Sequence, residues 1–124
     1  MALLLDTHVL LWWLQDDDTL DSGVRDRLDI DPEIVISTAT VWELGIKQAL
    51  GKLTGEGNLA EHARDSGFSV LPISAEHAIA ASALPQFHRD PFDRMLIGQA
   101  LVEGLTVMTR DRAFHAYGVP VESV

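Results

Sequence analysis

Short apolar runs that alternate with helix-like segments limit the folds open to this chain. The runs are Ala2–Leu5, Glu33–Ser37, Ser69–Ile73 and Leu105–Thr109, and Gly118–Val121 is a candidate for a fifth. Runs of this kind suit strands that are buried on both faces of a parallel sheet. The helical segments between them would then cover those faces. We therefore predict a three-layer α/β/α fold with a central, mostly parallel sheet of four to five strands.

The expected helices follow from apolar spacing and from residues that mark helix ends. Residues 9–14 show a helix-like pattern. The helices expected after it are Ser22–Leu28, Thr40–Leu50, Asn58–Ser66, Ala75–Leu84, Pro91–Glu103 and a short Arg112–Tyr117. Ser22 is the expected N-cap of the first of these, and Gly51 and Gly104 follow two others at the usual terminating position. No repeat or linker interrupts the pattern, so we predict a single domain over residues 1–124.

Composition restricts the classes of protein to consider. The chain has no cysteine, which excludes thiolate zinc sites and a cysteine nucleophile. Its longest apolar run, Val9–Leu14, is far shorter than the roughly 20 residues of a spanning helix. The first residues lack the basic start of a signal peptide, so we expect a cytoplasmic protein with no membrane partner. No Walker loop, Gly-x-Gly-x-x-Gly turn or Ser-His-Asp set is present.

Four acids fall where a parallel sheet would gather its functional groups. Asp6 ends the first strand, Glu43 follows the second, Asp93 opens the helix before the fourth strand, and Asp111 follows that strand. Ligands of such sheets bind beyond the carboxyl ends of the strands. We therefore expect these four carboxylates to converge at one edge of the sheet.

Each acid also has a purely structural interpretation. Glu43 could complete a capping box with Thr40 or pair with Lys47, four residues on. Asp6 and Asp111 could be helix N-caps.

Asp93 could form a salt bridge with Arg89 or Arg110. Its neighbour Asp90 is the expected N-cap, because Pro91 would then occupy the first helical position. Asp93 instead shares a helix face with the apolar residues Leu96, Ile97 and Ala100. Of the two acids, we therefore expect Asp93 at the functional site.

Four carboxylates that lie close together repel one another, so a bound cation is needed to offset their negative charge. Hard oxygen ligands favour Mg²⁺ or Mn²⁺, which complete their coordination shells with water and with phosphate oxygens of a substrate. Such a site hydrolyses phosphodiesters through a metal-activated water. The cation also reconciles the formal net charge of −10 with a polyanionic substrate. Arg89, Arg94 and Arg110 are candidate phosphate contacts.

Four motifs carry a family resemblance. Leu5-Asp6-Thr7-His8, Thr40-Val41-Trp42-Glu43-Leu44, the block from His88 to Ile97, and Met108-Thr109-Arg110-Asp111 occur in order over nearly the whole chain. Together they resemble the motifs of PIN-domain proteins, and more narrowly of VapC-type toxins of bacterial type II toxin–antitoxin modules.

The resemblance implies a PIN fold and a metal-dependent endoribonuclease. Asp6, Glu43, Asp93 and Asp111 would be its catalytic and metal-binding residues, and Thr109 a polar helper. It also implies a homodimer, and inhibition by an antitoxin that inserts a peptide at the active-site groove. One of the adjacent residues Trp12 and Trp13 is expected at a groove or an interface.

Two other functions remain open at this stage. One is a phosphohydrolase or phosphoacceptor domain with Asp6 as nucleophile, although position 8 is His8 where a phosphoaspartate phosphatase would have a second aspartate. The other is a non-catalytic binding module whose acids hold a structural ion. His62 and His77 are expected on helix surfaces. The sequence does not distinguish one metal ion from two, and it does not specify which RNA is cut.

Overall fold

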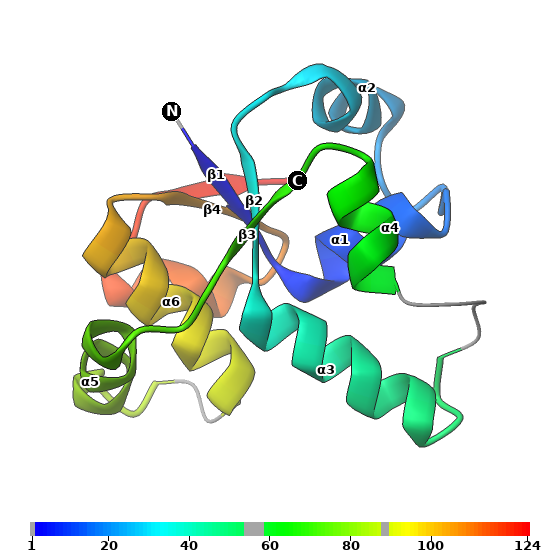
Figure 1. Ribbon diagram of the computed structural model, residues 1–124. Coiled ribbons are helices and arrows are strands. Elements are labelled where there is room, and N and C mark those ends of the chain that lie inside the picture. The colour runs from blue at the N-terminus through cyan, green and yellow to red at the C-terminus, as the bar shows by residue number, and fades with distance from the viewer. Residues whose placement is uncertain (1, 54–58, 88–89) are drawn as a thin grey trace.

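Five short parallel strands form the centre of the molecule (Figure 1). The computed structural model describes residues 2–53, 59–87 and 90–124. The strands are β1 Leu3–Leu5, β2 Ile34–Ser37, β3 Ser69–Leu71, β4 Thr106–Thr109 and β5 Val121–Ser123. They are ordered β3-β2-β1-β4-β5, and every neighbouring pair is parallel. The predicted fold class is confirmed.

Helices cover both faces of this sheet. They are α1 Thr7–Leu14, α2 Ser22–Ile30, α3 Thr38–Ala49, α4 Leu59–Asp65, α5 Ala75–Ala83, α6 Pro91–Glu103 and the 3₁₀ helix η1 Arg112–Tyr117. The first four lie on one side of the sheet in Figure 1, and α5 and α6 lie on the other. No helix in the described part of the chain is long and apolar enough to cross a membrane.

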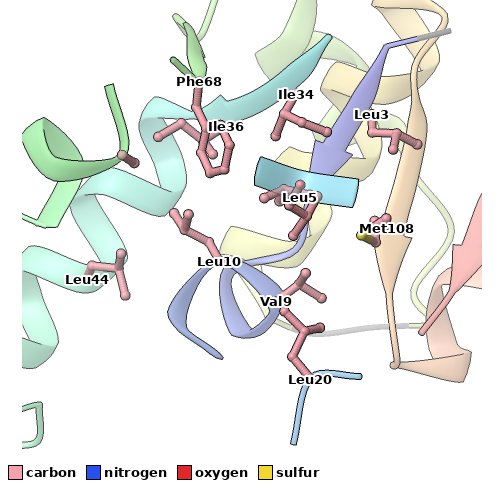
Figure 2. Packing of buried hydrophobic residues seen from close by; sticks show 12 residues of the cluster. Leu3, Leu5, Val9, Leu10, Leu20, Ile34, Ile36, Leu44, Phe68 and Met108 are labelled. Atoms are coloured by element: carbon pink, nitrogen blue, oxygen red, sulfur yellow. The ribbon is translucent and has the colours of Figure 1, made fainter. Parts of the chain in front are cut away.

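The strand β1 divides the hydrophobic core in two. Leu3 and Leu5 point into one apolar cluster with Val9 and Leu10 of α1, whereas Leu4 points into a second cluster on the opposite face. Figure 2 shows Val9 and Leu10 gathered around Leu5. All five side chains are buried. Burial on both faces explains why this strand reads as an uninterrupted apolar run.

The order of the strands places a topological switch point at the end of β1. The chain builds β2 and β3 on one side of β1, then crosses to form β4 and β5 on the other side. The Asp6 amide extends the β1–β4 ladder by donating to the Met108 carbonyl at 3.0 Å. Crevices at such switch points are where open α/β sheets bind their ligands.

Several strand and helix boundaries differ from the predictions, and two of them have a reason in the residues next to the boundary. The last strand begins at Val121 rather than Gly118, because Gly118 adopts a left-handed conformation with φ of 72° and terminates η1. The N-cap of α2 is Asp21, not Ser22, and its side chain accepts a hydrogen bond from Gly23. By contrast, α6 spans the predicted Pro91–Glu103, followed by Gly104 in the left-handed conformation.

A buried histidine connects α5 to α6. Ser74 and His77 form a reciprocal capping box, in which the Ser74 amide donates to His77 Nδ1 at 2.9 Å. The opposite ring nitrogen lies 3.3 Å from Glu103 Oε2 on α6. His77 is 2% exposed, so the predicted surface position is wrong for it, whereas His62 is exposed as predicted.

The contact between α5 and α6 requires a glycine. A Cβ atom at Gly98 would lie 2.9 Å from the Ala81 backbone nitrogen and 3.0 Å from the His77 carbonyl oxygen. We expect Gly98→Ala to lower the free energy of unfolding by about 1–3 kcal/mol through overpacking.

Gly45→Ala is the matched control, because a Cβ there meets no atom within 4 Å on the exposed face of α3. It should raise stability by roughly 0.5–1 kcal/mol through helix propensity. Urea unfolding of both variants measures the difference, and equal effects would contradict this account of the helix pair.

Candidate functional site

Asp6 is a buried carboxylate at the carboxyl end of the central strand. It occupies the N-cap position of α1, but its side chain makes no capping hydrogen bond. Instead, Oδ2 accepts a hydrogen bond of 2.7 Å from the Thr109 hydroxyl. The other oxygen, Oδ1, is buried and has no hydrogen-bond partner among the described residues. The N-cap interpretation is therefore wrong for the side chain, whose second oxygen is available to a ligand.

Thr109 links Asp6 to Asp111. Its hydroxyl donates to Asp6 and accepts a 3.0 Å hydrogen bond from the Asp111 amide. Asp111 Oδ1 in turn accepts from the Ala113 amide at 2.9 Å, so Asp111 does cap η1 as the structural interpretation proposed. The expected role of Thr109 as a polar helper fits these contacts, because they orient Asp6 and the Asp111 backbone together.

The surroundings of Asp6 disfavour its negative charge. Burial raises the pKa of Asp6, and the nearby Asp111 carboxylate raises it further. The Thr109 hydrogen bond and the charge of His8 lower that pKa, but they offset the effect of burial only in part. A bound cation would remove this electrostatic cost, which is the arrangement expected of a metal ligand.

Glu43 approaches from α3 and also has an unused oxygen. The helix begins at Thr38, where Ser37 accepts a hydrogen bond from the Ala39 amide, so the predicted capping box from Thr40 is wrong. The Thr40 hydroxyl lies instead 3.1 Å from that of Thr7 in α1.

The predicted pairing of Glu43 with Lys47 is confirmed, with 3.5 Å between Oε2 and Nζ. Glu43 Oε1 is buried and has no hydrogen-bond partner among the described residues. Like Asp6, Glu43 therefore keeps one oxygen that a cation could use.

Asp90 is the N-cap of α6 as predicted, whereas the place of Asp93 at the functional site stays a prediction. Asp90 Oδ1 accepts hydrogen bonds from the amides of Phe92 at 2.8 Å and Asp93 at 3.4 Å, which confirms Asp90 as the N-cap of α6. Asp93 is half-buried and lies on the same face as the buried residues Leu96 and Ile97.

The start of α6 adjoins α3 across a groove of about 490 Å³. Its lining includes Glu43 and Lys47 from α3, and Asp90 and Phe92 from α6. The first turn of α6, which carries Asp93, therefore lies beside the helix that carries Glu43.

Asp6, Glu43, Asp93 and Asp111 do not form a complete set of metal ligands in this structure. Within residues 2–53, 59–87 and 90–124, no three His, Asp or Glu side chains lie close enough together to hold an ion. Mg²⁺ commonly uses only one or two carboxylates and several waters. The unpaired oxygens of Asp6 and Glu43 fit that chemistry, and the four-ligand set remains a prediction.

The predicted phosphate contacts have other roles or lie outside the described residues, as Arg89 does. Arg94 donates to the carbonyls of Pro85, Ala81 and Leu84 at 2.9–3.0 Å, so it binds the end of α5 rather than a substrate. Arg110 donates to the carbonyls of Val124 and Thr19, both at 2.8 Å.

The expected place of Trp12 or Trp13 at a groove or an interface stays a prediction. Trp12 and Trp13 are both half-buried. Trp12 lies under the Arg110 guanidinium, 4.6 Å from the ring centre, and Trp13 packs on Phe68. The exposed tryptophan is Trp42, at 65%, which contacts the Phe92 ring edge to face at 5.3 Å. Its place next to Glu43 in the chain was the signal that could have identified it.

Known proteins share this architecture. The family model of the PIN domain matches residues 3–120. Ribonuclease VapC22 of Mycobacterium tuberculosis is 29% identical over 127 aligned positions, which cover 96% of this chain and 94% of that protein.

Solved structures with the same fold include DNA-bound VapBC from Salmonella typhimurium. The match has 25% identity and a TM-score of 0.74, and covers 99% of this chain and 98% of that one. A toxin–antitoxin complex from Klebsiella pneumoniae matches with 23% identity and a TM-score of 0.67, and covers 98% of this chain and 96% of that one. At that identity, the second match supports the fold alone.

The burial of Asp6 predicts a gain in stability when its charge is removed. Because its pKa is raised in the folded protein, ionised Asp6 destabilises the fold at neutral pH. We expect Asp6→Asn to raise the urea midpoint at pH 7 in metal-free buffer. The gain should shrink as the pH falls through the folded-state pKa, because Asp6 then takes up a proton.

Asp26→Asn, at an exposed position of α2, is the control and should change the midpoint little. A lower midpoint for Asp6→Asn at pH 7 would contradict the electrostatic description of the site.

Proposed function

The chain belongs to the PIN-domain family, and we propose that it is a ribonuclease that acts as the toxin of a type II toxin–antitoxin module. The observation that carries the proposal is the buried Asp6 carboxylate at the switch point, with one oxygen fixed by Thr109 and the other unpaired. Similarity over nearly the full length to a protein named ribonuclease VapC22 supports the same reaction class. Similarity to a VapBC structure supports the toxin role.

The reaction would depend on Mg²⁺ or Mn²⁺ held by Asp6 and Glu43, with Asp93 and Asp111 as further ligands. When bound, the ion supplies Lewis-acid polarisation of the phosphodiester and a water of lowered pKa. Thr109 keeps the Asp6 carboxylate in one orientation, and Lys47 holds one oxygen of Glu43. The Thr7–Thr40 contact fixes α3 against α1 and so keeps Glu43 at the end of the sheet.

We also propose an antitoxin partner, as in the VapBC complex that the chain resembles, and a homodimer, as the motif resemblance to VapC-type toxins implies. The groove between α3 and the start of α6 suits an inserted peptide, because Ile46, Leu50 and Phe92 give it an apolar lining. Exposed Trp42 packs against the Phe92 ring. Lys47 and Lys52 add positive charge to the same groove. RNA is the proposed substrate, and its sequence would be selected by surface shape around the site.

The phosphohydrolase alternative has less support. The Asp6 oxygen bound by Thr109 and the acidic neighbour Asp111 suit a metal ligand better than an isolated nucleophile. A covalent phosphoaspartate on Asp6 would favour that alternative over the ribonuclease.

The test is cleavage of RNA by the purified protein. We expect cleavage with Mg²⁺ or Mn²⁺, loss in EDTA, and recovery on adding the metal back. Asp6→Asn should reduce the rate by about 100-fold or more, because it removes a ligand rather than a support of one. Asp26→Asn is the matched control, since it removes an exposed carboxylate and should keep full activity.

Capillary electrophoresis of a fluorescent RNA reports the cleavage rate. Undiminished activity of Asp6→Asn, or activity unaffected by EDTA, would overturn the assignment.

A further inference from the structure

A basic pocket lies beside the candidate active site, in a protein whose net charge is −10. It has a volume of about 510 Å³ and is lined by Arg110, Arg112, His115, Ser123 and Val124. We call these five residues the basic pocket. Three basic side chains in one hollow of an acidic protein create a local positive potential, which attracts an anion.

The register of the sheet places Ser123 of the basic pocket two strands away from Asp6, with β4 between them. β4 and β5 are paired in parallel, and Ser123 lies opposite Thr109, whose hydroxyl donates to Asp6. Neighbouring strands are about 4.8 Å apart. Arg112 also follows Asp111 directly in the chain. Two strand spacings amount to about 10 Å, so a ligand group in the basic pocket would lie at the same edge of the sheet as one at the carboxylates, about that far away.

Arg112 is the least committed cation of the basic pocket. It is exposed and forms no hydrogen bond or ion pair with the part of the chain that the structure describes. Arg110, in contrast, donates hydrogen bonds to the carbonyls of Thr19 and Val124 and stacks on the Trp12 ring. These contacts hold its side chain in one position at the side of the basic pocket. His115 Nε2 lies 3.5 Å from the Ser123 hydroxyl, which places two further polar groups near Arg112.

The two acids nearest the basic pocket in the chain are bound by groups other than Arg112. Glu122 forms an ion pair with Arg27 of α2, and successive side chains of a strand point to opposite faces, so it points away from Ser123. Asp111 Oδ1 accepts a hydrogen bond from Ala113 within η1. The guanidinium of Arg112 therefore remains available to an anion from solution.

We propose that Arg112, with His115 and Ser123, binds a backbone phosphate of the RNA adjacent to the one that is cleaved. The proposal rests on the ribonuclease function and adds to it a second contact that sets the direction of the strand. A guanidinium is suited to this contact because its planar N–H groups bind two phosphate oxygens at once. The scissile phosphate would lie at the acidic centre and its neighbour in the basic pocket.

Steady-state cleavage of a short fluorescent RNA tests the contact. We expect Arg112→Gln to raise KM by about 10-fold or more while kcat stays within about twofold, because the lost bond involves a charged group. Arg112→Lys should recover part of the affinity. Arg64→Gln is the matched control: it removes one exposed arginine on α4, away from the basic pocket, and should leave KM unchanged.

Neutral phosphate substitutions locate the contact on the RNA. Each phosphate near the cut is replaced in turn by a methylphosphonate, and KM is measured for the unmodified protein and for Arg112→Gln. We expect one position, next to the scissile phosphate, where the replacement raises KM for the unmodified protein but not for Arg112→Gln.

Equal effects on both proteins at every position, or equal KM values for Arg112→Gln and Arg64→Gln, would overturn the phosphate contact and leave the ribonuclease function standing. If the unmodified protein neither binds nor cleaves RNA, both proposals are wrong.

Discussion

The hydrogen bond from Thr109 to Asp6 is the interaction on which the candidate site depends. It joins the ends of β4 and β1, two neighbouring strands that lie far apart in the sequence. Two buried apolar clusters hold β1 between them, so the Asp6 backbone has little freedom to move. The side chain is thereby held in a place that disfavours its charge. Such a carboxylate is suited to a cation because binding relieves the cost of burial.

The distribution of charge is consistent with an acidic protein that handles a polyanion. Asp6 and Glu43 each keep one buried oxygen without a hydrogen-bond partner among the described residues, whereas Arg112 and His115 of η1 share a pocket with Ser123 of β5. An acidic centre repels phosphate until a cation is bound, and a basic pocket attracts it directly. The two regions together would place one RNA strand in a defined orientation, with its phosphates at two different kinds of site.

Helix boundaries were predicted best where the residues at both ends of the helix left only one choice. Pro91 and Gly104 mark both ends of α6, and the helix spans the predicted residues with Asp90 as its N-cap. The start of α3 was misplaced because Ser37 and Thr40 are both good N-caps, and the contact of Thr40 with Thr7 appears only in the folded chain. The burial of His77 likewise depends on α6, which supplies Glu103.

The roles of the arginines could not be read from sequence. Arg94 lies next to Asp93 in the chain, which suggested a substrate contact, yet it binds the carbonyls at the end of α5. Arg112 had no motif to distinguish it, and its place in a pocket beside the candidate site follows from the pairing of β5 with β4. The packing of α5 against α6 determines the role of Arg94, and strand pairing determines the position of Arg112; local spacing in the sequence carries no information about either.

The most direct test of the central claim is calorimetric titration of the metal-free protein with Mn²⁺. We expect a metal site at Asp6, with binding that Asp6→Asn abolishes, that Asp26→Asn leaves intact, and that Thr109→Val weakens by about 10–100-fold through loss of the orienting hydrogen bond. Binding of Mn²⁺ to Asp6→Asn with unchanged affinity, or no binding by the unmodified protein, would contradict it.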